Sequence, residues 1–179
     1  MRRRFLVFAF VFLSVAGHAE TRDGAGAAAL AQIRTLAGDW EGTLEWTGAR
    51  SGTGNVSATY SQTGNGSAVV EDLVMGGVRS MTSVYHLDGS DLRMTHYCAA
   101  ENQPRLKAQR IDLARGAVDF AFVDATNLRS PDAPHVHGFE MRFVDGDHIL
   151  LTFLFQSGDK QSRERIQLTR LHPKPADKH

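Results

Sequence analysis

Residues 38–171 form one long succession of short strand-like segments separated by tight turns. Apolar residues alternate within each segment, and turn signals such as 88–90, 145–147 and 157–159 recur about every ten residues. Only the segment around 127–134 breaks this pattern. An antiparallel meander with no helical layer buries its apolar face best by closing on itself. The sequence therefore predicts an all-β fold, a closed antiparallel up-and-down barrel, whose interior is a candidate ligand site.

The alternation predicts about ten strands. They are expected at residues 38–48, 54–62, 67–75, 79–87, 91–98, 104–113, 117–124, 135–144, 148–156 and 161–171. A short helix is expected over residues 28–35, where apolar residues fall on one face, and it could plug one end of the barrel. The last strand carries charge on both faces, so it is expected either at the seam of the barrel or past its rim.

The N-terminus has the layout of a secretory signal peptide. Arg2, Arg3 and Arg4 precede an apolar stretch over 5–15, and small residues flank His18 at a cleavage position after Ala19. The stretch is too short to span a bilayer, although a retained anchor is the alternative. We therefore expect a periplasmic or secreted protein with no transmembrane segment after cleavage. The expected organisation is a signal peptide (1–19), a flexible leader (20–29), a β-barrel (30–172) and a disordered tail (173–179).

Length and charge narrow the class of protein further. Removing 19 of 179 residues leaves 160, enough for a single domain with a real core. Without Arg2, Arg3 and Arg4, the 20 Lys and Arg residues become 17 against 20 Asp and Glu, a net charge of −3, which argues against nucleic-acid binding. Cys98 is the only cysteine, so it is either a buried, inert side chain or a reactive thiol.

The first strand opens with Gly38-Asp39-Trp40-Glu41-Gly42, directly after the expected helix. This segment resembles the Gly-x-Trp signature of lipocalin-like (calycin) barrels. The longer Gly-x-Trp-x-Gly spacing is similar to the start of bacterial lipocalin-like domains of unknown function and of nitrobindin-type haem barrels. The resemblance, which covers about residues 30–171, implies a barrel in which Trp40 packs across one end and Gly38 and Gly42 allow close strand curvature.

Two departures from the nitrobindin pattern concern haem. Those barrels continue with further alternating glycines and carry a haem-ligating histidine near the end of the barrel. Here Thr43-Leu44-Glu45 follows the motif, and His172 is followed by Pro173 and a polar tail. The ligand role is therefore not carried over to His172, tight haem binding is not expected, and the cofactor is unknown. Many such barrels bind apolar or amphipathic small molecules, but the fold does not choose the ligand.

The fifth expected strand and the connection after it contain the densest chemistry. Alternation places Met94, His96 and Cys98 on the inward face. A buried imidazole needs hydrogen-bond partners, so His96 is either a contact to a ligand, metal or haem, or a core histidine bonded to a neighbouring hydroxyl or carbonyl. In the connection, Asn102, Gln103 and Arg105 could hold the polar end of a ligand at the barrel mouth, or the two amides could only shape the loop. Arg105 is expected to reach inward and bind a carboxylate through two parallel hydrogen bonds.

A second candidate group lies in the eighth expected strand. His135 and His137 share their face with an apolar stripe and are expected to point inward, unless the prolines nearby keep His135 in a loop. A His-x-His pair suits Zn or Cu, but a third ligand would have to come from His96 or His86. The aromatic residues Tyr60, Tyr85 and Trp46 either line a pocket or belong to the core.

Enzyme signatures are missing from the sequence: it has no Gly-x-Ser-x-Gly elbow, phosphate-binding glycine loop or His-Glu-x-x-His motif. We therefore expect an exported protein that binds a small apolar or amphipathic molecule inside the barrel. The expected ligand contacts are Met94, His96, Cys98, Asn102, Gln103, Arg105, His137, Tyr85 and Trp46. The alternatives are an enzyme that uses His96, Asn102 and Arg105, and an envelope interaction module without a ligand. No metal site is assigned, and the oligomeric state is not indicated.

Overall fold

The computed structural model describes residues 22–172. The expected signal peptide and the expected C-terminal tail, 173–179, lie outside the described residues. Within residues 22–172, no helix combines the length and the apolar character needed to cross a membrane.

One helix precedes ten strands. The helix is α1 (Arg22–Arg34), and the strands are β1 (Gly38–Gly48), β2 (Gly52–Thr63), β3 (Ala68–Met75), β4 (Val78–Asp88), β5 (Asp91–Tyr97), β6 (Gln103–Asp112), β7 (Ala117–Thr126), β8 (His135–Phe143), β9 (His148–Ser157) and β10 (Lys160–Arg170). Every expected strand is present, with ends displaced by at most two residues. The helix begins at Arg22, well before the expected start at residue 28, so most of the segment expected as a flexible leader is helical.

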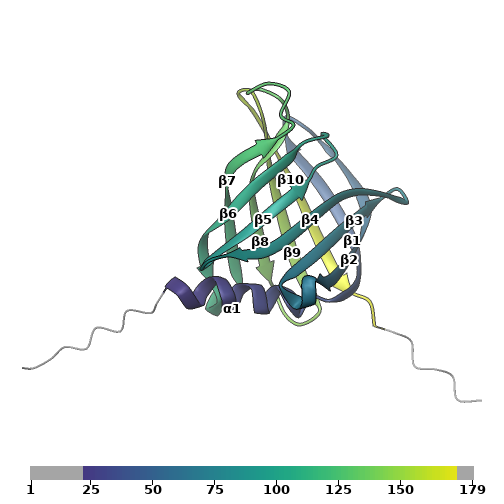
Figure 1. Ribbon diagram of the computed structural model, residues 1–179. Coiled ribbons are helices and arrows are strands. Elements are labelled where there is room, and N and C mark those ends of the chain that lie inside the picture. The colour runs from purple at the N-terminus through teal and green to yellow at the C-terminus, as the bar shows by residue number, and fades with distance from the viewer. Residues whose placement is uncertain (1–21, 173–179) are drawn as a thin grey trace, which may run out of the picture.

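The strands form a closed barrel in which each strand pairs with its sequence neighbours, as Figure 1 shows. β1 and β10 close the barrel in antiparallel register, from Trp40 opposite Arg170 to Gly48 opposite Ser162. β10 therefore lies at the seam, the first of the two expected positions. Among the ten described strands, closure leaves no sheet edge unpaired, which explains why a meander of this length needs no covering layer.

The helix covers one end of the barrel, which we call the helix end (Figure 1). Leu30 and Ile33 are buried there, each worth about 1.5–3 kcal/mol of apolar burial. Close approach requires glycine at position 26, because a Cβ there would lie 2.2 Å from the carbonyl oxygen of Ser90. The opposite end is formed by the connections at 49–51, 76–77, 98–102, 127–134 and 158–159, and we call it the loop end.

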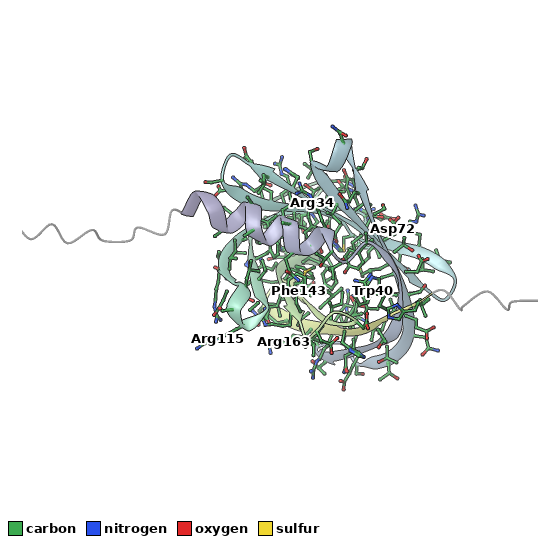
Figure 2. The ribbon with its side chains drawn as sticks, turned by 90° about the horizontal axis from the view of Figure 1, so that it is seen from below. Arg34, Trp40, Asp72, Arg115, Phe143 and Arg163 are labelled. Carbon is green, nitrogen blue, oxygen red and sulfur yellow. The ribbon has the colours of Figure 1, made fainter. Side chains whose placement is uncertain are left out.

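Trp40 closes the helix end as the resemblance implied. Its ring is fully buried and its indole N–H donates to the carbonyl oxygen of Leu36 at 2.8 Å. The guanidinium of Arg170 stacks 4.2 Å from the ring centroid. A Cβ at position 42 would lie 1.8 Å from the carbonyl oxygen of Gln167, so only glycine permits this strand contact. Viewed from the helix end, Trp40 and Phe143 lie inside the ring of strands beside α1 (Figure 2).

Candidate ligand-binding site

A row of polar side chains crosses four neighbouring strands inside the barrel. The register places Tyr60 of β2 opposite Glu71 of β3, Glu71 opposite Ser83 of β4, and Ser83 opposite His96 of β5. All four side chains are buried, at most 2% exposed. Each occupies an inward position of its strand, where most other inward residues are apolar. Four separate strands therefore bring one polar cluster into an apolar interior.

Glu71 is the centre of this cluster. Its Oε2 accepts hydrogen bonds from the hydroxyl groups of Tyr60, at 2.7 Å, and Tyr85, at 2.8 Å, and its Oε1 accepts one from Ser83 at 3.3 Å. Burial raises the pKa of Glu71, while the three hydroxyl donors act in the opposite direction. Burial and the neighbouring carboxyl raise the pKa values of Tyr60 and Tyr85 well above their ordinary value, so both remain donors. The hydrogen-bonding capacity of Glu71 is thus largely used within the cluster.

His96 ends the row and keeps one nitrogen without a partner. Its Nδ1 lies 3.0 Å from the Ser83 hydroxyl oxygen. Because the Ser83 proton is directed to Glu71, that oxygen accepts from Nδ1–H, which leaves Nε2 as an unprotonated acceptor. Nε2 is buried and has no hydrogen-bond partner among the described residues. Burial lowers the pKa of His96 to about 3, so the ring is neutral. The Nδ1 side of the imidazole is hydrogen-bonded like that of a core histidine, whereas Nε2 faces the interior without a hydrogen-bond partner.

Glu164 of β10 is a second buried polar group on the inner wall, and the sequence reasoning did not identify it as a site residue. It is 1% exposed and lies opposite Trp46 of β1 and Phe153 of β9. Within the part of the chain that the structure describes, neither carboxylate oxygen has a hydrogen-bond partner. Burial raises the pKa of Glu164 to about 7, against the opposing effect of the Arg50 charge. Phe153 also packs on His96, with ring centroids 5.0 Å apart, and so connects the two groups along the wall.

The loop end beside Glu164 is aromatic. Trp46 and Phe155 pack with ring centroids 4.9 Å apart. Arg50, an exposed residue of the β1–β2 turn, places its guanidinium 4.9 Å from the Trp46 ring centroid and 5.4 Å from that of Phe155. Cys98 is 8% exposed, and burial raises the pKa of its thiol. The thiol is therefore protonated, which fits the buried and inert interpretation.

The side chains of Asn102 and Gln103 form hydrogen bonds within the protein at the loop end. Asn102 is buried, and its amide nitrogen donates to the carbonyl oxygens of Pro134, at 2.8 Å, and Ala100, at 3.4 Å. It thereby ties the 98–102 connection to the 127–134 connection. Gln103 accepts a hydrogen bond from the Thr126 hydroxyl at 2.9 Å, at an exposed position. Both contacts match the loop-shaping alternative, although the Asn102 Oδ1 is buried without a partner among the described residues.

The expected inward orientation of Arg105 is wrong. The inward positions of β6 include Pro104 and Leu106, both buried, so the residue between them faces out. The Arg105 side chain is 53% exposed and forms two hydrogen bonds to the carboxylate of Asp124, at 2.5 and 2.6 Å. Arg105 does bind a carboxylate through two hydrogen bonds, but that carboxylate belongs to Asp124 of β7 on the outer surface and not, as expected, to a ligand.

The expected inward orientation of His137 is also wrong. The β8–β9 register shifts between Val136 and Gly138, and this irregularity exchanges the faces of the strand. Val136 is fully buried, whereas His137 is exposed. Its neighbour His135 is 5% exposed, and the two rings share Phe122 at centroid distances of 5.0 Å each.

The histidine pair has no third metal ligand in the described residues. Nε2 of His135 lies 3.2 Å from Nδ1 of His137, but no group of three or more His, Cys, Asp or Glu side chains in residues 22–172 is placed to hold a metal ion. His96 faces the interior and is hydrogen-bonded to Ser83, so it does not complete the pair. Burial, followed by the charge of His135, lowers the pKa of His137.

The remaining expected contacts face inward. Met94 and Tyr85 are fully buried, and Trp46 packs against the core. The structure thus brings His96, Met94, Tyr85, Trp46 and Cys98 to the inner wall. It adds three buried residues that the sequence reasoning missed, Glu71, Ser83 and Glu164, and it places the exposed Arg50 beside the aromatic pair at the loop end. Alternation gave a partial signal for Glu164, because Ser162, Ile166 and Leu168 share its face.

No family model matches this chain, and no curated protein matches it. Among solved structures, it is similar to a DUF3598-family protein of unknown function from Nostoc punctiforme, with 16% identity and a TM-score of 0.53 over 78% of this chain. The chain spans about half of that protein, 49% of its length. It is also similar to Rv2717c from M. tuberculosis, with 14% identity and a TM-score of 0.56 over 80% of this chain and 98% of that one. These likenesses show that the chain shares a barrel fold with both proteins.

Proposed function

We propose that the protein is an exported binding protein that holds a small apolar or amphipathic molecule inside its barrel, toward the loop end. The observation that carries this proposal is the set of buried, unpartnered polar atoms on the inner wall: Nε2 of His96 and both carboxylate oxygens of Glu164. Leaving such an atom unsatisfied costs about 1–3 kcal/mol, and more for a charged group. The other polar groups of the Tyr60–Glu71–Ser83 row are hydrogen-bonded to one another, so unsatisfied groups of this cost indicate a site that is completed by a ligand.

The surroundings of these atoms favour an apolar ligand body. Phe153 packs against His96, and Trp46 and Phe155 pack together beside Glu164. The two ends of the barrel also differ, because α1 and Trp40 cover the helix end. Entry from the loop end is therefore the shorter route to both polar groups. Export itself rests on the signal-peptide pattern of the first residues.

Binding is favoured over catalysis by what the interior lacks in residues 22–172. The enzyme alternative required His96, Asn102 and Arg105 to converge, but Arg105 lies on the outer surface and the Asn102 amide nitrogen binds two loop carbonyls. His96 is neutral over most of the pH range and has no acidic partner in direct contact. The pKa of Glu164 is about 7, but in residues 22–172 neither of its oxygens has a hydrogen-bond partner, so the interior holds no acid–base pair in contact.

The test uses a neutral fluorescent probe, N-phenyl-1-naphthylamine, whose emission rises in apolar surroundings. Saturable binding of one probe per chain is expected. Cys98→Phe adds a ring to the inner wall at the loop end and should weaken binding by about ten-fold or more. Tyr97→Phe is the matched control, because Tyr97 is the adjacent residue and is 51% exposed.

Far-ultraviolet spectra and unfolding midpoints of both variants accompany the titrations. Native mass spectrometry of the protein purified from its own host would show a retained ligand directly. No probe binding by the folded wild-type protein, together with no retained ligand, would refute the proposed function. Equal affinity in the two variants would move the site away from the loop-end interior.

A further inference from the structure

We infer that the ligand carries a cationic, hydrogen-bond-donating head group, such as an ammonium on an apolar body, and that Glu164 binds this head. The inference rests on the proposed function and assigns the chemical class of its ligand. Two observations support it: the unpartnered polar atoms on the inner wall are hydrogen-bond acceptors, and an aromatic pair lies beside Glu164.

The free atoms on the inner wall are hydrogen-bond acceptors. The two carboxylate oxygens of Glu164 have no donor within the described residues, and Nε2 of His96 is an acceptor in the tautomer fixed by Ser83. Among the buried side-chain atoms of the described chain, the unpartnered donor nitrogens belong to Arg34, in α1, and Arg93, whose partners Asp88 and Asp91 lie at the helix end. A ligand that satisfies the wall must therefore bring N–H or O–H donors.

Charge selects among ligands that bring donors. An anionic head in contact with Glu164 would meet its carboxylate at hydrogen-bond distance, whereas the opposing Arg50 charge forms no hydrogen bond to either oxygen. A cationic head would be attracted to the same carboxylate and would supply the missing hydrogen bonds. Its arrival favours the ionised form of Glu164, whose pKa of about 7 keeps that form within reach at neutral pH.

The aromatic pair beside Glu164 favours a cation as well. Trp46 is the direct cross-strand neighbour of Glu164, and Phe155 packs on Trp46. Arg50 demonstrates that these two rings accept a positive charge, since its guanidinium lies about 5 Å from both centroids. The Arg50 charge acts on Glu164 without pairing with either of its oxygens, so a hydrogen bond to this carboxylate is left to the ligand.

Three amphiphiles with the same chain and different heads test this inference: dodecylamine, dodecanol and dodecanoate. Each displaces the neutral naphthylamine probe at about pH 8, where Glu164 is mostly ionised and the amine is still protonated. The expected order of affinity is amine, then alcohol, then carboxylate. Glu164→Gln should lower the amine affinity by about ten-fold or more and leave the alcohol affinity unchanged. Glu45→Gln is the matched control, because Glu45 is exposed on the outer face of β1 next to Trp46.

The compared quantity is the ratio of amine to alcohol affinity within each protein, which does not depend on the folded fraction. A wild-type protein that binds all three amphiphiles equally, or the carboxylate best, overturns the inference and leaves the proposed function standing. An amine preference that survives Glu164→Gln overturns the role of Glu164. Failure of the folded wild-type protein to bind the probe or any amphiphile would instead count against the proposed function.

Discussion

Replacing Glu164 by Gln is expected to change the pH dependence of stability in a defined direction. The folded protein holds the pKa of this buried carboxyl at about 7, while the unfolded chain has the ordinary value of 4.5. Between these two values the folded state binds more protons than the unfolded state. Stability therefore falls as pH rises through this window, and the loss is complete above about pH 7. A neutral Gln side chain has no such dependence.

The size of the effect follows from the two pKa values. Each pH unit corresponds to about 1.4 kcal/mol, so moving the pKa from 4.5 to about 7 costs the ligand-free protein about 3 kcal/mol at pH 8. Burying the Gln amide adds an offset that does not vary with pH. The difference in free energy of unfolding, variant minus wild type, should therefore grow by about 3 kcal/mol from acid to alkaline pH.

Guanidinium denaturation followed by far-ultraviolet circular dichroism, in steps from roughly pH 4.5 to 8.5, measures this difference. Other titrating groups, such as Glu71, are common to both proteins and cancel in the comparison. Glu45→Gln should run parallel to the wild type, because Glu45 is exposed. If the difference in free energy of unfolding between Glu164→Gln and wild type stays constant with pH, the conclusion that the Glu164 carboxylate is buried and unpartnered is refuted.

Four further outcomes are expected. His96 stays neutral in the folded protein, with a pKa near 3 against an ordinary 6.5, so stability falls as pH drops below 6.5; at pH 5 the loss is about 2 kcal/mol, and His96→Gln should lack it in the same denaturation series. Trp40→Ala should lower the free energy of unfolding by about 3–5 kcal/mol, and an unchanged denaturation midpoint would contradict its place in the core. Arg105→Ala should leave probe affinity unchanged, because its partner is Asp124 on the outer surface; a ten-fold weaker titration, about 1.4 kcal/mol, would return it to the site. Haem added to the protein is expected to give no sharp Soret band, and a band lost in the His96 variant would reverse this expectation.

Local patterns in the sequence determined the architecture. Strand alternation and glycine-rich turns depend on a few adjacent residues. They therefore predicted all ten strands, with each predicted end at most two residues from the observed end. Closure followed, because a meander without a helical layer has one efficient way to bury its apolar face. The alternation of side chains along a strand also predicted correctly that Met94 and His96 point inward, because the pairing of β5 has no register shift.

The tertiary structure decided the site, because the site is made of contacts between strands. In β3, Val69, Glu71 and Leu73 form one face and Val70, Asp72 and Val74 the other, so either acid was an equally good candidate for burial. Glu71 faces inward where the register supplies the hydroxyl groups of Tyr60, Ser83 and Tyr85. The bulge that turned His137 outward depends on pairing between β8 and β9. Burial of a charge is tolerated or not according to partners on other strands, and a linear sequence does not state which residues will face each other.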